Sequence, residues 1–234
     1  MLATADEAKM FKWAADNGAD VISCSWGPSC GIGEKDLLPD NVAGAIQYCA
    51  TEGRAKKGIP ICWAAGNGDE LVSDDGYASN PDVMAIAAST SPDSDGAESH
   101  APYSDHGPEI WVCAPSSGNR RKGDKDIFTV DRRGNAGYNV GTETKGDKDG
   151  NYTNDFGGTS SAAPFAAGIA ALILSVNPRL TSDQVREIIK NTADQIGDRS
   201  TYSIQNGRDQ LHSDFFGFGR INAIRAVEAA KRST

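Results

Sequence analysis

The stretch FGGTSSAAPFAAGIAAL, Phe156 to Leu172, carries the strongest local pattern in the chain. Two glycines allow a sharp backbone turn, and a helical pattern of nearly all small side chains follows from about Ser160. Small side chains let such a helix pack closely against its neighbours. A helix N-terminus offers unpaired N–H groups and the positive end of a dipole, which can hold an oxyanion. The stretch predicts a buried helix with Ser160 either as a nucleophile or only as an N-cap.

The rest of the chain alternates helical patterns with short apolar runs. The apolar runs are VISCSWG from Val21, IPICWAAGNG from Ile59, VMAIAAS from Val83 and IWVCAPS from Ile110. The other helical patterns cover residues 5–17, 41–52, 181–192 and 222–231. Strands that are apolar on both faces and alternate with helices are typical of a parallel sheet covered on both sides. The predicted fold class is therefore α/β, with residues 1–234 in one domain.

Residues 118–157 differ from the rest of the chain in composition, because they are polar, charged and glycine-rich. We interpret them as a hairpin or loop insertion within the domain. Only DIFTV, residues 126–130, resembles a strand. We predict a hairpin turning near residues 133–135 and then an exposed loop over 142–153. The segment DKDG, residues 147–150, resembles part of a calcium loop, but an EF-hand spacing needs a further acid that is absent. An exposed loop is the favoured interpretation.

Composition excludes several classes of function. The 234 residues are 38% hydrophobic and carry a formal net charge of −9, which argues against a nucleic-acid surface or an anionic-membrane anchor. The longest apolar stretch, Ala162 to Val176, is interrupted and shorter than the roughly 18 residues that span a bilayer, so no membrane span is predicted. The first residues show neither the basic start nor the apolar run of a signal peptide.

The five cysteines show no C-x-x-C spacing that would suggest zinc. Cys24, Cys62 and Cys113 lie inside apolar runs, so we expect inert buried thiols there. A disulfide between Cys30 and Cys49 remains open.

A second candidate element is WAAGNG, which ends a predicted strand with Asn67 between two glycines. Open α/β sheets bind ligands at the carboxyl ends of their strands. An asparagine amide there can donate to an oxyanion, and the Ala65-Gly66 backbone is bare enough to lie beside an extended peptide. Alone, Asn67 reads equally well as a turn residue, but its combination with Ser160 favours a catalytic role.

These motifs resemble those of the subtilisin-like serine peptidases, the subtilases of family S8, in order and across nearly the whole chain. The matching segments are ISCSWG at 22–27, AAGN at 64–67, GTSSAAP at 158–164 and GFGRINAIRAV at 217–227. The segments SWGP at 25–28, DGYASN at 75–80, YSDHG at 103–107 and VDRRG at 130–134 are similar to the kexin-type, proprotein-convertase-like branch. The resemblance implies a three-layer fold and a serine endopeptidase that works through an acyl-enzyme without a catalytic cofactor.

The resemblance also assigns site residues. It implies Ser160 as nucleophile, Asn67 as oxyanion donor and Asp75 as the acid of a pocket for a basic side chain. Asp105 matches a position that helps to bind structural calcium. The expected substrate-binding residues are Ser25, Trp26, Gly27, Ala65, Gly66, Asp75 and Thr159. A second pocket acid of the kexin-type branch is replaced here by Ser29 and Cys30, so the preference for arginine or lysine stays open.

The aspartate and histidine motifs of the subtilase triad, D-T/S-G and H-G-T-H, do not occur in this sequence. We therefore expect a partial catalytic domain without its first strands and histidine helix, weakly active or inactive alone. The missing segment is then a candidate partner, beside a peptide or protein substrate, and the resemblance suggests a secreted protein.

Three other interpretations of the function have less support from the sequence than the subtilase resemblance. A local relay of Asp105 and His106 with Ser160 is disfavoured, because the matching family segment lies by the calcium site. An α/β-hydrolase order of Ser160, Asp198 and His212 lacks the apolar strand that should precede the serine. A non-catalytic peptide-binding module, or a truncated gene product, remains the third.

Overall fold

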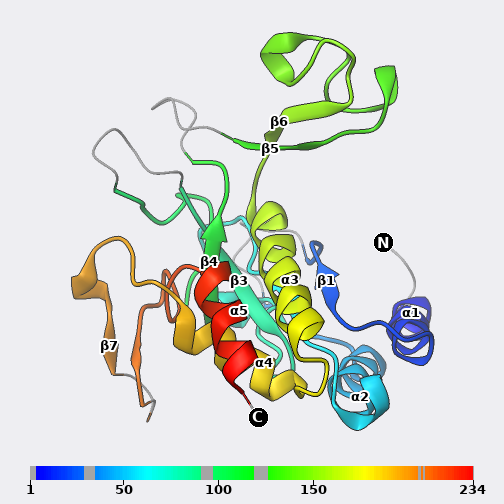
Figure 1. The fold of residues 1–234 in the computed structure, drawn as a ribbon, viewed down its shortest axis with the longest axis vertical. Coiled ribbons are helices and arrows are strands. Elements are labelled where there is room, and N and C mark those ends of the chain that lie inside the picture. Colours follow the sequence, from blue (N-terminus) through cyan, green and yellow to red (C-terminus); the bar gives the residue numbers. More distant parts are fainter. Residues whose placement is uncertain are drawn as a thin grey trace.

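The computed structural model describes residues 4–28, 35–90, 97–118, 126–204, 207 and 209–233. At its centre lies a parallel four-stranded sheet in the order β1-β2-β3-β4 (Figure 1). The strands are β1 (Ile22–Cys24), β2 (Ile61–Ala64), β3 (Met84–Ser89) and β4 (Ile110–Pro115). Each predicted apolar run holds one of them, and every residue of β2 and β3 is buried. Burial on both faces explains why these strands read as continuous apolar runs.

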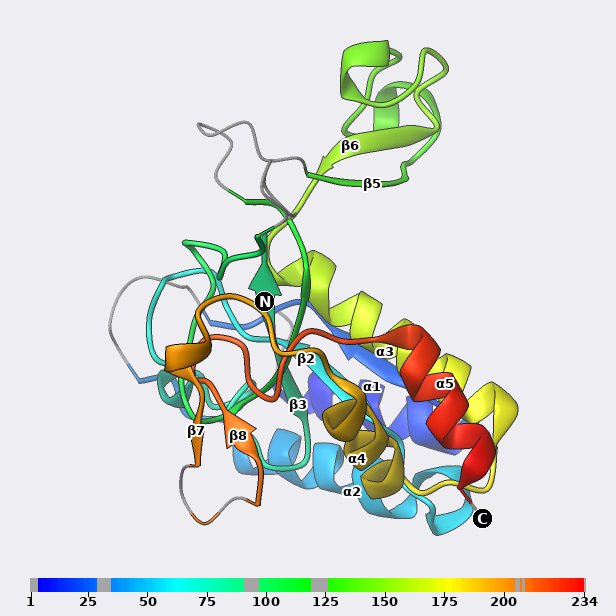
Figure 2. The ribbon, with the colours of Figure 1, turned by 60° about the vertical axis from the view of Figure 1, so that its left-hand side comes forward.

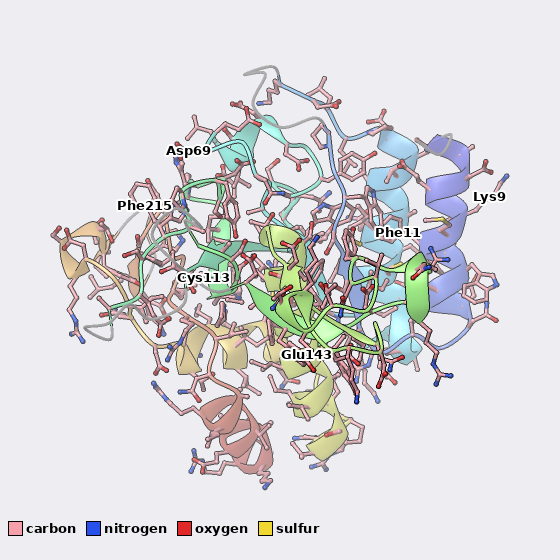
Figure 3. The ribbon with its side chains drawn as sticks, turned by 90° about the horizontal axis from the view of Figure 1, so that it is seen from above. Lys9, Phe11, Asp69, Cys113, Glu143 and Phe215 are labelled. Carbon is pink, nitrogen blue, oxygen red and sulfur yellow. The ribbon has the colours of Figure 1, made fainter. Side chains whose placement is uncertain are left out.

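Helices cover both faces of the sheet (Figure 2), so the predicted α/β class is confirmed. The helices are α1 (Thr4–Asp16), α2 (Asp40–Lys56), α3 (Thr159–Val176), α4 (Ser182–Thr192) and α5 (Ala223–Arg232). Strand alternation divides the core: Cys62 packs on the side of α3, α4 and α5, whereas Trp63 packs on the side of α1 and α2. Figure 3 shows Phe11 of α1 directed inward and Lys9 directed outward.

The backbone leaves the helical conformation directly after the predicted helical range 41–52. Gly53, Arg54 and Ala55 have non-helical φ and ψ angles within the range of α2. A Cβ on Gly53 would lie 2.5 Å from the Ile59 side chain, so the chain needs a glycine where it turns toward β2.

Four described cysteines, Cys24, Cys49, Cys62 and Cys113, are free and buried. Burial raises the pKa of the Cys62 thiol to about 12, which makes it a poor nucleophile at neutral pH. Cys49 donates a hydrogen bond from its Sγ to the Phe11 carbonyl at 3.1 Å. Cys30 lies outside the described residues.

An arm, residues 127–156, projects away from the sheet (Figures 1 and 2). It pairs β5 (Ile127–Val130) with β6 (Tyr152–Phe156) in antiparallel fashion. The predicted hairpin turning near residues 133–135 is wrong: a 3-10 turn lies at Gly134–Ala136, but β5 pairs with β6 only after residues 131–151. The wider boundaries, 118–157, stay a prediction.

The fully buried side chain of Asn139 organises residues 131–151, which connect β5 to β6. Its amide donates to the carbonyls of Asp147 and Tyr152 at 2.7 and 2.9 Å, and its Oδ1 accepts from the Gly141 and Thr142 N–H groups. The Asp147 carboxylate of the DKDG segment accepts from the Asn151 and Tyr152 N–H groups. These backbone N–H groups thus bond to Asp147 Oδ1, an oxygen that would be a ligand in a calcium loop.

The helix α3 is long and apolar enough, by length and composition, to cross a membrane. Half of it is buried inside the protein, and it packs against all four strands of the sheet. This environment is typical of the core helix of a globular domain.

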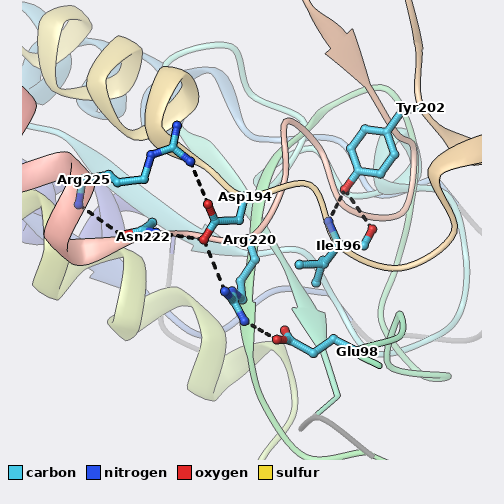
Figure 4. A network of polar contacts seen from close by, with 7 residues as sticks. All are labelled: Glu98, Asp194, Ile196, Tyr202, Arg220, Asn222 and Arg225. Carbon is cyan, nitrogen blue, oxygen red and sulfur yellow. Dashed lines mark hydrogen bonds and ion pairs between the residues drawn. The ribbon is translucent and has the colours of Figure 1, made fainter. Parts of the chain in front are cut away.

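The C-terminal segments close the fold. A polar network around Asp194 joins Arg220, Asn222 and Arg225, and Arg220 also pairs with Glu98 (Figure 4). This network fixes the chain at the start of α5. The remaining short elements are β7 (Ser203–Ile204), β8 (Leu211–His212) and the 3-10 turns η1 (Val72–Asp74), η3 (Gly134–Ala136), η4 (Glu143–Lys145) and η5 (Arg199–Thr201).

Candidate active site

A pocket of about 170 Å³ gathers most of the predicted site residues where the carboxyl ends of β1 and β2 meet the start of α3. Its lining consists of Ser25, Trp26, Gly27, Pro28, Ala64, Gly66, Asn67, Asp75, Thr159 and Ser160. Of the expected catalytic and binding residues, Ala65 alone does not line it, and the candidate calcium ligand Asp105 lies outside it as well. The structure therefore brings together segments that are up to 135 residues apart in sequence.

Ser160 lies in the first turn of α3 and touches the Ser25 segment. Pro164 within α3 has no N–H to donate to the carbonyl four residues earlier, which is that of Ser160. The Ser25 hydroxyl donates to this carbonyl instead, at 3.1 Å. The proline of the GTSSAAP motif thus leaves an acceptor through which the Ser25 segment is tied to the candidate nucleophile.

Asn67 is oriented by Thr159. Its Oδ1 accepts from the Thr159 N–H at 2.8 Å and from the Thr159 hydroxyl at 3.1 Å. The Thr159 hydroxyl also accepts from the Gly66 N–H at 3.2 Å and lies 3.1 Å from the Gly66 carbonyl. Thr159 therefore connects the segment after β2 to the start of α3. With Oδ1 held against the helix, the donor end of the amide is the opposite end of the group.

A network of hydroxyl groups, which the sequence did not reveal, fixes the turn before Ser160. Ser116 contacts Ser161 at 2.7 Å and donates to the Gly158 carbonyl at 2.7 Å. The Tyr103 hydroxyl joins Ser116 at 2.9 Å and Ser117 at 3.0 Å. Gly158 has a φ of +75°, and its N–H donates to the Ser117 hydroxyl. The network holds this left-handed turn, so the position of Ser160 depends on residues of two distant loops.

Asp75 is a buried acid at the pocket wall beside Gly27. Its Oδ1 accepts from the Tyr77 N–H at 2.7 Å and the Ala78 N–H at 3.3 Å. Burial, followed by the charges of Asp36 and Glu70, raises the pKa of Asp75 to about 6 although the two amides lower it. A cationic side chain in the pocket would favour the ionised carboxylate.

Asp105 holds the turn after Asn67. Its Oδ1 accepts from the Gly68 N–H at 2.7 Å and the Glu70 N–H at 3.2 Å, and burial raises its pKa to about 6. A Cβ on Gly66, whose φ is +116°, would lie 1.8 Å from Asp105 Oδ2, so only glycine fits. Across the described ranges, no three His, Cys, Asp or Glu side chains form a group that could hold a metal ion. The assignment of Asp105 to structural calcium stays a prediction.

The three histidines of the chain have contacts elsewhere. His212 is fully buried and its Nε2 lies 2.7 Å from the Ile110 carbonyl. The rings of His100 and His106 pack against Phe215, and burial lowers the pKa of His100 to about 4. None of the three lines the Ser160 pocket. Neither the Asp105–His106 relay nor the α/β-hydrolase order is assembled there, and Asp198 caps a 3-10 turn instead.

The three-layer fold and this pocket define a subtilisin-like serine peptidase domain. Residues 1–219 match the model of the Subtilase family, and the chain belongs to that family.

Named relatives agree with this assignment. The chain is 48% identical over 238 residues to the calcium-dependent protease of Nostoc sp., an alignment that covers 98% of this chain and 35% of that protein. It is 30% identical over 236 residues to kexin of Saccharomyces cerevisiae, covering 98% of this chain and 26% of kexin. The solved structure of Aeromonas sobria serine protease with its chaperone superimposes at a TM-score of 0.79, with 18% identity, over 99% of this chain and 46% of that one. The chain thus spans about a third or less of the length of these two curated relatives.

Proposed function

We propose that this chain supplies the nucleophile, the oxyanion donor and the peptide cleft of a serine endopeptidase. The shared pocket of Ser160 and Asn67 is the observation that carries the proposal. In this proposal Ser160 Oγ attacks the scissile carbonyl, and the Asn67 amide and the Ser160 N–H stabilise the resulting oxyanion. Expulsion of the amine leaves an acyl-enzyme on Ser160, which water then hydrolyses. The proton of the Ser160 hydroxyl must pass to a base and then to the leaving amine.

The base is the part that this chain does not place in the pocket, because all three histidines are engaged elsewhere. We therefore expect little or no peptidase activity from the chain alone. Labelling of the purified chain with a fluorophosphonate tests this directly. Slow labelling that Ser160→Ala abolishes supports both Ser160 as nucleophile and the low activity of the chain alone, whereas rapid stoichiometric labelling of Ser160 would contradict the low activity.

The partner proposed to supply the base is a polypeptide segment with the D-T/S-G and H-G-T-H motifs. The strand β1 lies at the edge of the sheet, and beside it a pocket of about 160 Å³ is lined by Met10, Phe11, Ala14, Ile22, Ser23, Cys24 and Trp26. An unpaired strand edge flanked by apolar side chains is suited to take a further strand. Adding such a segment should raise the Tm and accelerate labelling of Ser160. An unchanged Tm and labelling rate would contradict this part.

The proposed preference for basic side chains rests on Asp75. A carboxylate pairs with arginine or lysine only when ionised, so affinity for a basic peptide should rise as the pH increases through about 6. Fluorescence anisotropy of labelled acetyl-Arg-amide and acetyl-norleucine-amide at pH 5 and 7.5 measures this. The arginine ligand should gain affinity with pH and lose that gain in Asp75→Asn. Equal pH dependence of both ligands would contradict the preference.

A peptide-binding module without catalysis is the second candidate, favoured by the position of the histidines. It predicts saturable peptide affinity that survives Ser160→Ala and weakens in Asp75→Ala. Recovery of Ser160 labelling in the presence of the complementing segment would exclude it.

Structural calcium stays a prediction from the resemblance and from the name of the Nostoc relative. It expects millimolar calcium to raise the Tm, and Asp105→Asn to remove this increase. A secreted site of action likewise stays a prediction.

A further inference from the structure

An aromatic cluster lies directly behind the Ser25–Gly27 segment. Trp63 on β2 is fully buried, and its ring centroid lies 4.8 Å from that of Trp26 with an interplanar angle of 60°. Phe11 of α1 and Tyr77 complete the cluster at 6.0 and 5.2 Å from the Trp63 ring. The cluster thus supports the segment from the side opposite to solvent.

Trp63 also makes a polar contact with this segment. Its Nε1–H donates to the Trp26 carbonyl at 2.8 Å. A buried indole N–H needs a partner, and here the partner is the carbonyl of the middle residue of the proposed peptide-binding edge. The orientation of that peptide group is therefore fixed from inside the protein.

The consequence for the edge follows from strand geometry. In an extended segment, successive carbonyls point to opposite sides. The Ser25–Gly27 segment follows β1 directly, and Gly27 is not among the described glycines with a positive φ. An extended Ser25–Gly27 segment with the Trp26 carbonyl directed toward Trp63 would present the carbonyls of Ser25 and Gly27 on the opposite side. The Gly27 backbone makes no hydrogen bond to another residue within the described part of the chain, as expected of an edge that receives a peptide.

We infer that Trp63 is a positioning residue whose indole N–H sets the Ser25–Gly27 edge for strand addition by the peptide. The inference deepens the proposed function and rests on it. Trp63 does not line the pocket, so it acts through Trp26 and not by touching the substrate.

The same cluster reaches Asp75 by a separate route. Tyr77 packs on Trp63 and donates its N–H to Asp75 Oδ1, while its hydroxyl donates to Glu7 Oε2 at 3.0 Å. A test of the Trp63 N–H must therefore keep the volume of the ring, since a smaller side chain would disturb Asp75 as well. Replacing Trp63 by benzothienylalanine keeps the bicyclic shape and exchanges the N–H for sulfur.

The experiment compares two ligands on the full chain. Acetyl-Arg-amide is too short to extend along Gly27, whereas acetyl-Ala-Ala-Arg-amide can pair with it. The measured quantity is the gain in affinity from the short to the long ligand. We expect the benzothienylalanine variant to lose about 3- to 10-fold of this gain, the range for one net hydrogen bond, with the affinity of the short ligand unchanged. Trp63→Phe should show the same loss of gain, with any packing defect appearing in both ligands.

Trp111→Phe is the matched control. Trp111 Nε1–H also donates to a backbone carbonyl, that of Arg186 at 3.2 Å, but Trp111 lies on β4 and does not line the pocket. Its substitution should leave the gain intact. An undiminished gain in both Trp63 variants would overturn the inference and leave the proposed function standing. The absence of any gain in the unmodified chain would overturn the peptide cleft itself.

Discussion

At the scale of single residues, the ionised form of Asp75 has opposite effects on the stability of the fold and on the proposed binding of a basic side chain. Its pKa of about 6 lies above that of an unfolded aspartate, about 3.9, so the folded chain binds the proton more tightly. This proton-linked stabilisation is fully present below about pH 4 and is lost as the pH rises through about 6. At neutral pH the buried charge therefore destabilises the fold while it serves the proposed recognition of a cation.

The first prediction follows from this conflict. Asp75→Asn keeps an oxygen for the Tyr77 and Ala78 amides and removes the charge. We expect its free energy of unfolding at pH 7.5 to exceed that of the parent by about 1 to 3 kcal/mol, and the difference to vanish near pH 4. Urea denaturation across this pH range measures it. The exposed Asp149→Asn is the control, and a pH-independent difference would contradict the prediction.

The second prediction concerns the hydroxyl network behind Ser160. Ser116→Ala removes the partner shared by Tyr103 and Ser161 and one donor to the Gly158 carbonyl. We expect a loss of about 1 to 3 kcal/mol in the free energy of unfolding, because buried polar groups lose partners. Ser175→Ala, which removes an exposed hydroxyl bonded to Leu172, should cost less than about 0.5 kcal/mol. Similar Tm values for the two variants would argue against a structural role of the network.

At the scale of elements, the arm and the helix α3 contrast sharply. The helix packs against every strand of the sheet, whereas β5 and β6 make their main contacts with each other and with η4. The arm also exposes apolar side chains, among them Phe128, Val130 and Tyr138. Its order therefore depends on its own hydrogen bonds and not on the core.

The third prediction is that the arm opens without global unfolding. Amides bonded only within the arm, such as Asp131 N–H to the Asn151 carbonyl, should exchange with solvent faster than core amides such as Ala65 N–H to the Ile86 carbonyl. Hydrogen exchange resolved by peptide or by NMR gives the opening free energies. Equal protection of both amides would mean that arm and core unfold as one unit.

At the scale of the whole molecule, we expect the edge of β1, which pairs only with β2 within the described residues, to be the site most prone to association. The net charge of −9 opposes association in general, but β1 and the neighbouring apolar side chains of α1 offer a local contact surface. Met10 lines this surface and is 44% exposed.

The fourth prediction tests that surface. The chain should self-associate at high concentration, and Met10→Lys should weaken this association by introducing a charge beside the edge. Ile224→Lys on α5, at a site 74% exposed, serves as control and should have no effect. Sedimentation velocity at increasing concentration measures both. Equal association of the two variants would place the contact elsewhere.

Sequence patterns predicted the parts of the fold in which burial shapes composition. The four strands and the small-residue helix could be recognised because burial on all sides requires continuous apolar or small residues. The strand that pairs with β5 was mispredicted because β6, with the polar sequence YTNDF, carries no such signal and follows β5 only after residues 131–151. In the site, family motifs located the lining residues. Ser116 and Trp63 were missed because their partners lie 45 and 37 residues away and no local pattern marks such pairs.

The close packing of Trp26 and Trp63 has an optical consequence. The electronic transitions of two indoles 4.8 Å apart and inclined by 60° couple to each other, so the circular dichroism of the pair depends on their mutual angle. Trp26 lines the pocket and Trp63 lies behind it, so we expect the circular dichroism of this pair to change when a ligand binds in the pocket. A ligand that moves the Trp26 ring changes this signal without any attached dye, and binding can be followed in the unlabelled chain.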